Sequence, residues 1–280
     1  MQNAVLGIIG HPISHTLSPL MHNAAAQMLS LPYVYAAFDV KPENLKKSVE
    51  AFRMLGLRGL NVTVPHKVAV MKYIDALDEE ATGIGAVNTI LNNDGVMTGY
   101  NTDGIGFVRS LKSEGFSPKG RKVALIGAGG SARAIGVSLL KAGASNVTVI
   151  NRSKPGGARL ARELSGFGGS EFALASGGDA GKIIGSSDLV VQTTPMGMKK
   201  NDPLPIADTP FEKGQLVYDI IYSPFETRFL KIARDRGCRT INGLGMLVYQ
   251  GSESFRIWTG KKFPEEKILT LLRGFIKKGK

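Results

Sequence analysis

A lysine and an aspartate within the first 103 residues form the pair best suited to proton transfer. Lys67 follows the apolar run 59–64, and Asp103 follows a second such run that ends at residue 100. Functional groups of α/β proteins collect where strands end. When an alcohol is oxidised to a ketone, a base must take the hydroxyl proton, and a desolvated lysine can shift its pKa toward neutrality whereas arginine cannot. The alternative is a solvated lysine and a turn-forming or capping aspartate.

A hydroxyl-rich segment, 10–19, offers a second kind of site. Ser18 and Pro19 predict the start of a helix, with Ser18 as the N-cap and Pro19 as the first helical residue. If the segment before this helix is extended, Thr16 and Ser18 face the same side. Two hydroxyls beside the positive end of a helix dipole could hold a carboxylate. Capping alone is the alternative, and it leaves Thr16 without a role.

A glycine-rich turn follows the apolar run 123–126 and has the sequence Gly127-Ala128-Gly129-Gly130-Ser131-Ala132. Its spacing is that of a dinucleotide fingerprint, in which the first glycine allows a tight turn and the second lets a pyrophosphate approach the backbone. A helix and then the apolar strand 146–150 are predicted to follow. The free N–H groups at the helix start favour phosphate. A purely structural turn is the alternative.

The residues after strand 146–150 indicate which dinucleotide is bound. Sites for NAD usually place an acidic residue there, but this chain has Asn151-Arg152-Ser153-Lys154. Arg152 and Lys154 can neutralise a 2′-phosphate, and Arg152 could also stack on adenine. We therefore expect NADP as the cofactor, with a solvated basic loop as the alternative.

The composition limits the partners of this 280-residue chain. Its net charge is +12 and 43% of its residues are hydrophobic, which suits a globular protein with a full core. The basic residues are scattered, apart from the tail at 277–280, and are not interleaved with aromatic residues, so we expect no nucleic-acid partner. The charge favours an anionic small-molecule substrate and a phosphorylated cofactor, and it is equally compatible with a role in solubility.

The single cysteine, Cys238, excludes an internal disulfide, and no His or Cys pattern has the spacing of a metal site. The apolar run at the N-terminus is too short for a signal peptide, and no run reaches the roughly 18 residues of a membrane span. We therefore expect a cytoplasmic protein without metal or membrane. The oligomeric state is left open, with a homodimer as one option.

The pattern of elements predicts an α/β protein of two domains. Residues 1–103 alternate strands with helices and contain a hairpin signal at 92–95, so we expect a mixed sheet there. Pro65 is expected to open a helix, which places Lys67 in its first turn. Residues 104–244 predict a Rossmann-like domain, in which 165–185 is too rich in glycine to assign. Helices in 245–280 are expected to return to the first domain.

Seven segments together resemble the shikimate dehydrogenase family over nearly the whole chain. They are 10–19, 61–67, 85–89, 101–104, 127–132, 151–153 and 242–250. The resemblance implies an oxidoreductase that uses NADPH to reduce 3-dehydroshikimate to shikimate, on the route to chorismate and the aromatic amino acids. It implies that Lys67 handles the proton at the reacting oxygen, while Asp103 binds a hydroxyl and tunes Lys67. Thr16 and Ser18 would hold the substrate carboxylate.

The resemblance also implies roles for further residues. The ring hydroxyls and acid end of the substrate would contact Thr63, Asn88 and Gln250, and Tyr222 would close over them. The pyrophosphate would lie on residues 127–131 and the 2′-phosphate ribose on residues 151–154. The nicotinamide would lie against Ile220 and Gly243, and Glu79 would make a minor contact on the cofactor side.

Two departures from the family pattern affect specificity. Thr16 stands where the family usually has serine, which leaves open a quinate/shikimate dehydrogenase with relaxed cofactor use. Gly156 stands near a position where the family often has a further arginine, and Lys154 could compensate. A non-catalytic shikimate-binding regulator on the same scaffold is another alternative, although the presence of both Lys67 and Asp103 argues against it.

Overall fold

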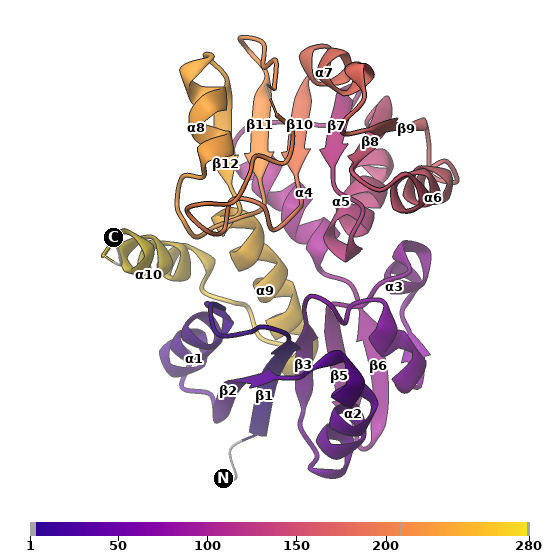
Figure 1. Cartoon of the computed structure of the whole chain (residues 1–280). Coiled ribbons are helices and arrows are strands. Elements are labelled where there is room, and N and C mark those ends of the chain that lie inside the picture. Colours follow the sequence, from indigo (N-terminus) through magenta and orange to yellow (C-terminus); the bar gives the residue numbers. More distant parts are fainter. Residues whose placement is uncertain (1–3, 208, 279–280) are drawn as a thin grey trace. The chain divides into compact units, whose positions relative to one another are not determined.

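Alternating apolar strands and helices build two α/β units, each with its own sheet (Figure 1). The computed structural model describes residues 4–207 and 209–278. The first unit comprises Met1–Gly106 and Val248–Leu272, and the second comprises Phe107–Leu247 and Arg273–Lys280. Residues 273–278 were expected with the first domain but group with the second unit, and residues 279–280 lie outside the described part of the chain. In the second unit, the Lys277 amine lies 5.7 Å from the centroid of the Phe225 ring.

The sheet of the first unit is mixed, as expected. Its strands are β1 (Ala4–Gly10), β2 (Tyr33–Asp39), β3 (Gly59–Val62), β4 (Ala76–Leu77), β5 (Thr89–Asn93) and β6 (Val96–Tyr100), in the order β2-β1-β3-β5-β6-β4. β1 is parallel to β2 and β3, whereas β5 is antiparallel to β3 and β6. The turn residues Asp94 and Gly95 have φ values of 51° and 91°, which the predicted two-residue hairpin requires.

Helical segments cover both faces of this sheet. They are α1 (Ser18–Met28), η1 (Pro42–Asn44), α2 (Leu45–Met54), η2 (Ala69–Tyr73), α3 (Glu79–Ile84), and parts of α9 (Leu244–Thr259) and α10 (Glu265–Lys278). Neighbouring residues of β1 face opposite cores, because Ile9 clusters with α2 residues whereas Ile8 clusters with Trp258 of α9. The Trp258 indole occupies the space of a Cβ on Gly59 and donates Nε1 to the Ile90 carbonyl at 2.9 Å. This close approach fixes α9 against the sheet.

The sheet of the second unit is entirely parallel. Its strands are β7 (Lys122–Ile126), β8 (Asn146–Asn151), β9 (Ser170–Leu174), β10 (Leu189–Gln192), β11 (Leu216–Asp219) and β12 (Arg239–Asn242), in the order β12-β11-β10-β7-β8-β9. Its helices are α4 (Asp103–Ser113), which leads in from the first unit, α5 (Gly130–Lys141), α6 (Lys154–Leu164), α7 (Gly178–Gly185) and α8 (Arg228–Asp235). This strand order is that of a doubly wound dinucleotide-binding fold, so the expected α/β class is confirmed. Within the described part of the chain, no helix is both long and apolar enough to cross a bilayer.

Two local expectations in the first unit are wrong. The N-cap of α1 is Leu17, and Ser18 is the first helical residue rather than the cap. Pro65 opens no α-helix, because residues 64–68 form turns and the 3₁₀ helix η2 follows them. The Lys67 carbonyl instead accepts a hydrogen bond from the Val87 N–H at 2.8 Å. A long-range bond therefore takes the carbonyl that an α-helix would have used.

Candidate active site

Lys67 and Asp103 form a buried ion pair in the first unit. Lys67 lies in the turn after β3, and Asp103 is the first residue of α4. The Lys67 Nζ lies 2.5 Å from Asp103 Oδ2, and the two side chains are only 11% and 5% exposed. Within such a pair the amine can give or accept a proton while the carboxylate fixes its position. The pair that the sequence singled out is thus brought together.

Backbone hydrogen bonds explain why the two side chains meet. The Val87–Lys67 bond ties the turn after β3 to the segment before β5, and the Asn88 N–H donates to the Tyr100 carbonyl at 3.0 Å. Asn101 Oδ1 accepts from the Asp103 N–H at 3.1 Å, which sets the start of α4. The ends of β3, β5 and β6 therefore deliver the lysine, an asparagine and the aspartate to one place.

Asn88 orients the aspartate. Its Nδ2 donates to Asp103 Oδ1 at 2.8 Å and to Thr102 Oγ1 at 2.9 Å, while its Oδ1 accepts from the Thr102 N–H at 2.8 Å. Because the carboxylate needs a donor and the N–H needs an acceptor, only one orientation of this amide satisfies both. Gln250 of α9 joins the group, with Oε1 3.3 Å from Asn88 Nδ2.

Thr16 and Ser18 lie together at the amino end of α1. Their hydroxyl oxygens are 3.1 Å apart, and Thr16 Oγ1 accepts from the Ser18 N–H at 3.2 Å. Thr16 therefore supplies a side-chain acceptor at the start of the helix. The alternative of capping alone gave a role to Ser18 and none to Thr16. Two adjacent hydroxyls at the positive end of a helix can bind a carboxylate.

The remaining first-unit candidates lie at element ends. Thr63 directly follows β3 and is half-buried. Glu79 is exposed in the first turn of α3, whose N-cap is Asp78. His66 is buried, with Nε2 2.6 Å from the Val40 carbonyl, so it is not placed for acid–base work.

The fingerprint of the second unit has the geometry that its spacing predicts. Gly127 has a φ of +114°, and a Cβ there would crowd the Thr193 hydroxyl. Gly129 is the N-cap of α5 and has no atom within 4 Å of a built Cβ, so its surface is open to a ligand. Ala132 is fully buried, as close packing of helix and strand requires. Residues Gly127, Ala128, Gly129, Gly130 and Ser131 therefore form a strand–turn–helix suited to pyrophosphate.

The basic segment after β8 also lies at a helix start. Asn151 ends β8 and donates Nδ2 to the Ser153 carbonyl at 2.9 Å, and Lys154 opens α6. Arg152, Ser153 and Lys154 are exposed, and the first turn of α6 has no acidic residue. The positive end of the helix dipole thus adds to two basic side chains, an arrangement that suits a 2′-phosphate.

Ile220 and Gly243 adjoin at the carboxyl ends of β11 and β12. A Cβ on Gly243 would overlap the Ile220 carbonyl, and the Gly243 N–H donates to the Ile221 carbonyl at 3.0 Å. Tyr222 follows in the same loop and is half-buried. The cofactor-side candidates of the second unit therefore all lie at the carboxyl edge of its sheet, where doubly wound folds bind ligands.

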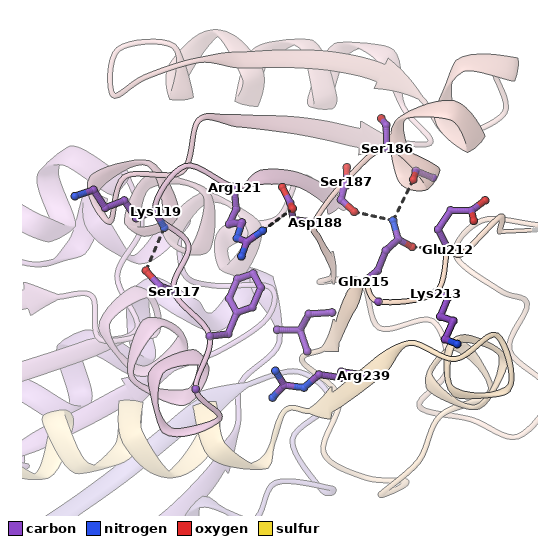
Figure 2. A pocket seen from close by; sticks show the side chains of 15 residues that line it. Ser117, Lys119, Arg121, Ser186, Ser187, Asp188, Glu212, Lys213, Gln215 and Arg239 are labelled. Carbon is purple, nitrogen blue, oxygen red and sulfur yellow. Dashed lines mark hydrogen bonds and ion pairs between the residues drawn. The ribbon is translucent and has the colours of Figure 1, made fainter.

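A cavity of about 670 Å³ lies at the opposite, amino edge of the same sheet (Figure 2). Several of its polar groups already have partners: Arg121 pairs with Asp188 at 2.9 Å, and the Gln215 amide donates to the carbonyls of Ile184 and Ser187 at 2.6 and 2.7 Å. The residues that the sequence predicts for nucleotide binding lie at the other, carboxyl edge. Among the described residues, no group of His, Cys, Asp and Glu side chains could hold a metal ion.

Sequence reasoning missed a set of buried polar residues behind Asn88 and Asp103. They are Tyr35, Asn61, Thr89, Thr102 and Ser254. The available signal was weak: Ser254 follows Gln250 by four residues and so shares its helical face, but most of the contacts are far apart in sequence.

Comparison with known proteins agrees with this arrangement. Residues 8–90 match the model of the shikimate dehydrogenase substrate binding domain, residues 110–198 that of shikimate / quinate 5-dehydrogenase, and residues 243–273 that of the shikimate 5'-dehydrogenase C-terminal domain. Shikimate dehydrogenase (NADP(+)) of Moorella thermoacetica is 46% identical over 272 residues, which cover 96% of this chain and 92% of that protein.

Solved structures agree as well. A shikimate dehydrogenase crystallised with NADP+ is 40% identical, with a TM-score of 0.90 over 99% of this chain and 98% of the other. The enzyme from Listeria monocytogenes, in complex with shikimate and NAD, is 37% identical, with a TM-score of 0.87 over 96% of each chain. From its sequence, its two sheets and these similarities, the chain belongs to the shikimate dehydrogenase family.

Proposed function

We propose that this protein is an NADP-dependent shikimate dehydrogenase that reversibly reduces 3-dehydroshikimate to shikimate. The observation that carries the proposal is the buried Lys67–Asp103 pair, 2.5 Å apart. Lys67 lies within the segment 8–90 that matches the family's substrate binding domain, and Asp103 follows that segment. The fingerprint geometry and the basic start of α6 support NADP as the cofactor. Residues 1–103 and 245–280 would bind substrate, and residues 104–244 would bind the cofactor.

Bound NADPH supplies the hydride that reduces the substrate carbonyl. As that carbonyl carbon is reduced, Lys67 donates a proton from Nζ to its oxygen, which becomes the hydroxyl of shikimate. In the oxidative direction, the neutral Lys67 amine takes the same proton back. Asp103 holds Nζ in place and accepts a hydrogen bond from the product hydroxyl. A positioned acid or base of this kind contributes about 10²–10⁴-fold to the rate.

The remaining contacts follow from where each side chain lies. Thr16 and Ser18 would bind the substrate carboxylate with their adjacent hydroxyls. The hydroxyl of Thr63 would bind a ring hydroxyl. Asn88 would also bind a ring hydroxyl, which would replace its 3.3 Å contact with Gln250. Its shorter hydrogen bonds to Asp103 and Thr102 would remain.

On the cofactor side, residues Gly127–Ser131 would hold the pyrophosphate, and Asn151, Arg152, Ser153 and Lys154 the ribose and its 2′-phosphate. Ile220 and Gly243 would lie against the nicotinamide. Tyr222 would close over the substrate, and Glu79 would add a contact to the cofactor. These assignments are testable one residue at a time by substitution.

One assay tests the reaction. Reduced cofactor is followed by its absorbance with shikimate or quinate, each with NADP+ or NAD+. We expect the highest kcat/KM for shikimate with NADP+. A higher value for quinate with NAD+ would favour a quinate/shikimate dehydrogenase with relaxed cofactor use, which Thr16 and Gly156 leave open. Binding of shikimate without turnover would instead indicate a regulator.

Three sequence predictions concern partners and location. We propose a cytoplasmic protein without a nucleic-acid partner, with a homodimer as one option for its assembly. Light scattering measures the assembly directly. Micromolar DNA binding that weakens steeply with salt would contradict the prediction about nucleic acid.

A further inference from the structure

A buried hydrogen-bond network lies behind the proposed catalytic pair in the first unit. The Tyr35 hydroxyl donates to Asn61 Oδ1 at 2.7 Å, and Asn61 Nδ2 donates to Thr89 Oγ1 and to Ser254 Oγ, each at 3.1 Å. All four side chains are at most 5% exposed. The network therefore links strands β2, β3 and β5 to helix α9 within the first unit.

Ser254 is the hub of this network. Its Oγ lies 2.7 Å from Thr89 Oγ1, 3.1 Å from Thr102 Oγ1 and 3.1 Å from the Gln250 carbonyl, in addition to its bond from Asn61. A hydroxyl has one hydrogen and two lone pairs, so four neighbours are more than enough to use all three positions. Ser254 thereby connects helix α9 to residues at three strands: Asn61 within β3, Thr89 at the start of β5 and Thr102 after β6.

The network reaches Asp103 through two further bonds. Thr102, which Ser254 contacts, also donates its N–H to Asn88 Oδ1 at 2.8 Å, and Asn88 donates to Asp103 Oδ1 at 2.8 Å. Ser254 also lies one helical turn after Gln250, on the same face of α9. Its contacts thus fix both the rotation of α9, which carries Gln250, and the residues that hold the carboxylate.

We infer that Ser254 is a positioning residue, which orients Asp103 through Thr102 and Asn88 and presents Gln250 to the substrate. This inference rests on the proposed function, since its kinetic consequence requires shikimate turnover. Ser254 touches neither Lys67 nor Asp103 and takes no proton from the substrate. Its contribution is the alignment of the groups that do.

A matched control lies on the same helix. Ser252 is 7% exposed and donates its hydroxyl to Glu265 Oε1 at 2.5 Å, away from this network. Ser254→Ala and Ser252→Ala therefore each remove one buried, bonded hydroxyl from α9. Only Ser254→Ala removes a partner of Asn61, Thr89 and Thr102.

Steady-state kinetics separates the two variants. We expect Ser254→Ala to lower kcat/KM for shikimate about five- to tenfold, the effect of losing one buried hydrogen bond that aligns a reacting group, while the KM for NADP+ stays unchanged. Ser252→Ala should match the wild type in both. Three results would overturn the inference. They are an unchanged kcat/KM in folded Ser254→Ala, a rise in its KM for NADP+ as large as its loss of kcat/KM for shikimate, and a loss of kcat/KM in Ser252→Ala equal to that in Ser254→Ala.

A measurement without substrate keeps the inference separate from the proposed function. The Asn88 side-chain amide gives an NMR signal that is assigned by its loss in Asn88→Asp. We expect its hydrogens to exchange with solvent at least tenfold faster in Ser254→Ala than in Ser252→Ala. Equal exchange would refute the positioning role, whereas absence of shikimate turnover in the wild type would refute the proposed function alone.

Discussion

Asp219 makes the stability of the second unit depend on pH near neutrality. It ends β11 with a fully buried carboxyl group, and burial raises its pKa from 3.8 to about 7. Hydrogen bonds from Thr227 Oγ1 at 2.7 Å and from the Ile221 N–H at 3.0 Å favour the charged form but do not outweigh desolvation. These bonds hold the loop that carries the proposed nicotinamide contact Ile220.

The sign follows from the two pKa values. In the folded unit the Asp219 carboxyl group keeps its proton up to about pH 7, whereas in the unfolded chain it loses that proton near pH 3.8. The stabilisation is therefore complete below pH 3.8 and is lost as the pH rises through 7. A pKa shift of this size contributes on the order of 4 kcal/mol to the free energy of unfolding at low pH. Roughly 3 kcal/mol of this contribution is lost between pH 5 and pH 8.

Asp219→Asn tests this directly. The amide has nearly the same shape, can accept from the Ile221 N–H and can donate to the Thr227 hydroxyl, but it does not titrate. Hydrogen exchange of β11 amides, corrected for intrinsic rates, gives the opening free energy of the second unit at pH 5 and pH 8. We expect a decrease of roughly 3 kcal/mol in the wild type and none in the variant.

The control is Asp179→Asn, which changes an aspartate of the same unit whose side chain is 82% exposed. It should keep the pH dependence of the wild type. If wild type and Asp219→Asn lose the same free energy between pH 5 and pH 8, Asp219 is ionised throughout and the burial argument is wrong.

Three further predictions concern single side chains. Lys67→Ala should lower kcat about 10²-fold or more while shikimate still binds by calorimetry; unchanged turnover would exclude Lys67 from the proton transfer. Arg152→Gln should raise the KM for NADP+ about five- to tenfold and that for NAD+ much less, because only NADP+ carries the 2′-phosphate. His22→Phe should lower the pH at which the Trp258 fluorescence reports acid unfolding, since burial lowers the pKa of His22 from 6.5 to about 3 and its stabilisation is lost as the pH falls through that range; an unmoved midpoint would contradict this.

Local sequence signals predicted much of the fold. The positive φ angles at Gly127, Asp94 and Gly95 lie where glycine-rich or Asn/Asp-Gly turns were expected. Such conformations depend on the residue itself, so the sequence alone identifies them. The pairing of Lys67 with Asp103 was also anticipated, because both follow apolar strands whose ends meet in an α/β sheet.

The parts of the fold that the sequence did not predict depend on long-range contacts. The 3₁₀ and turn conformation around Lys67 depends on a bond to Val87, and no local pattern announces that partner. The strand β9 and helix α7 lie in the glycine-rich segment 165–185. Phe172 of β9 fills the space that a Cβ on Gly157 of α6 would occupy, so Gly157 allows α6 to pack against β9. Ser254 contacts residues more than 150 positions away.

His22 and Asp219 together give the two units opposite responses to acid. In the first unit, His22 is stacked on Tyr35 at 4.4 Å, and neither of its ring nitrogens has a hydrogen-bond partner among the described residues, so acid must place a charge where nothing solvates it. In the second unit, acid neutralises a carboxylate that burial disfavours. Between pH 7 and pH 5 the first unit therefore loses roughly 2 kcal/mol from His22 while the second gains about 2 kcal/mol from Asp219. If global unfolding is analysed as a two-state transition, the pH dependences of the two units largely cancel, and the fitted free energy of unfolding changes little with pH. Trp258 fluorescence and β11 hydrogen exchange instead report each unit separately.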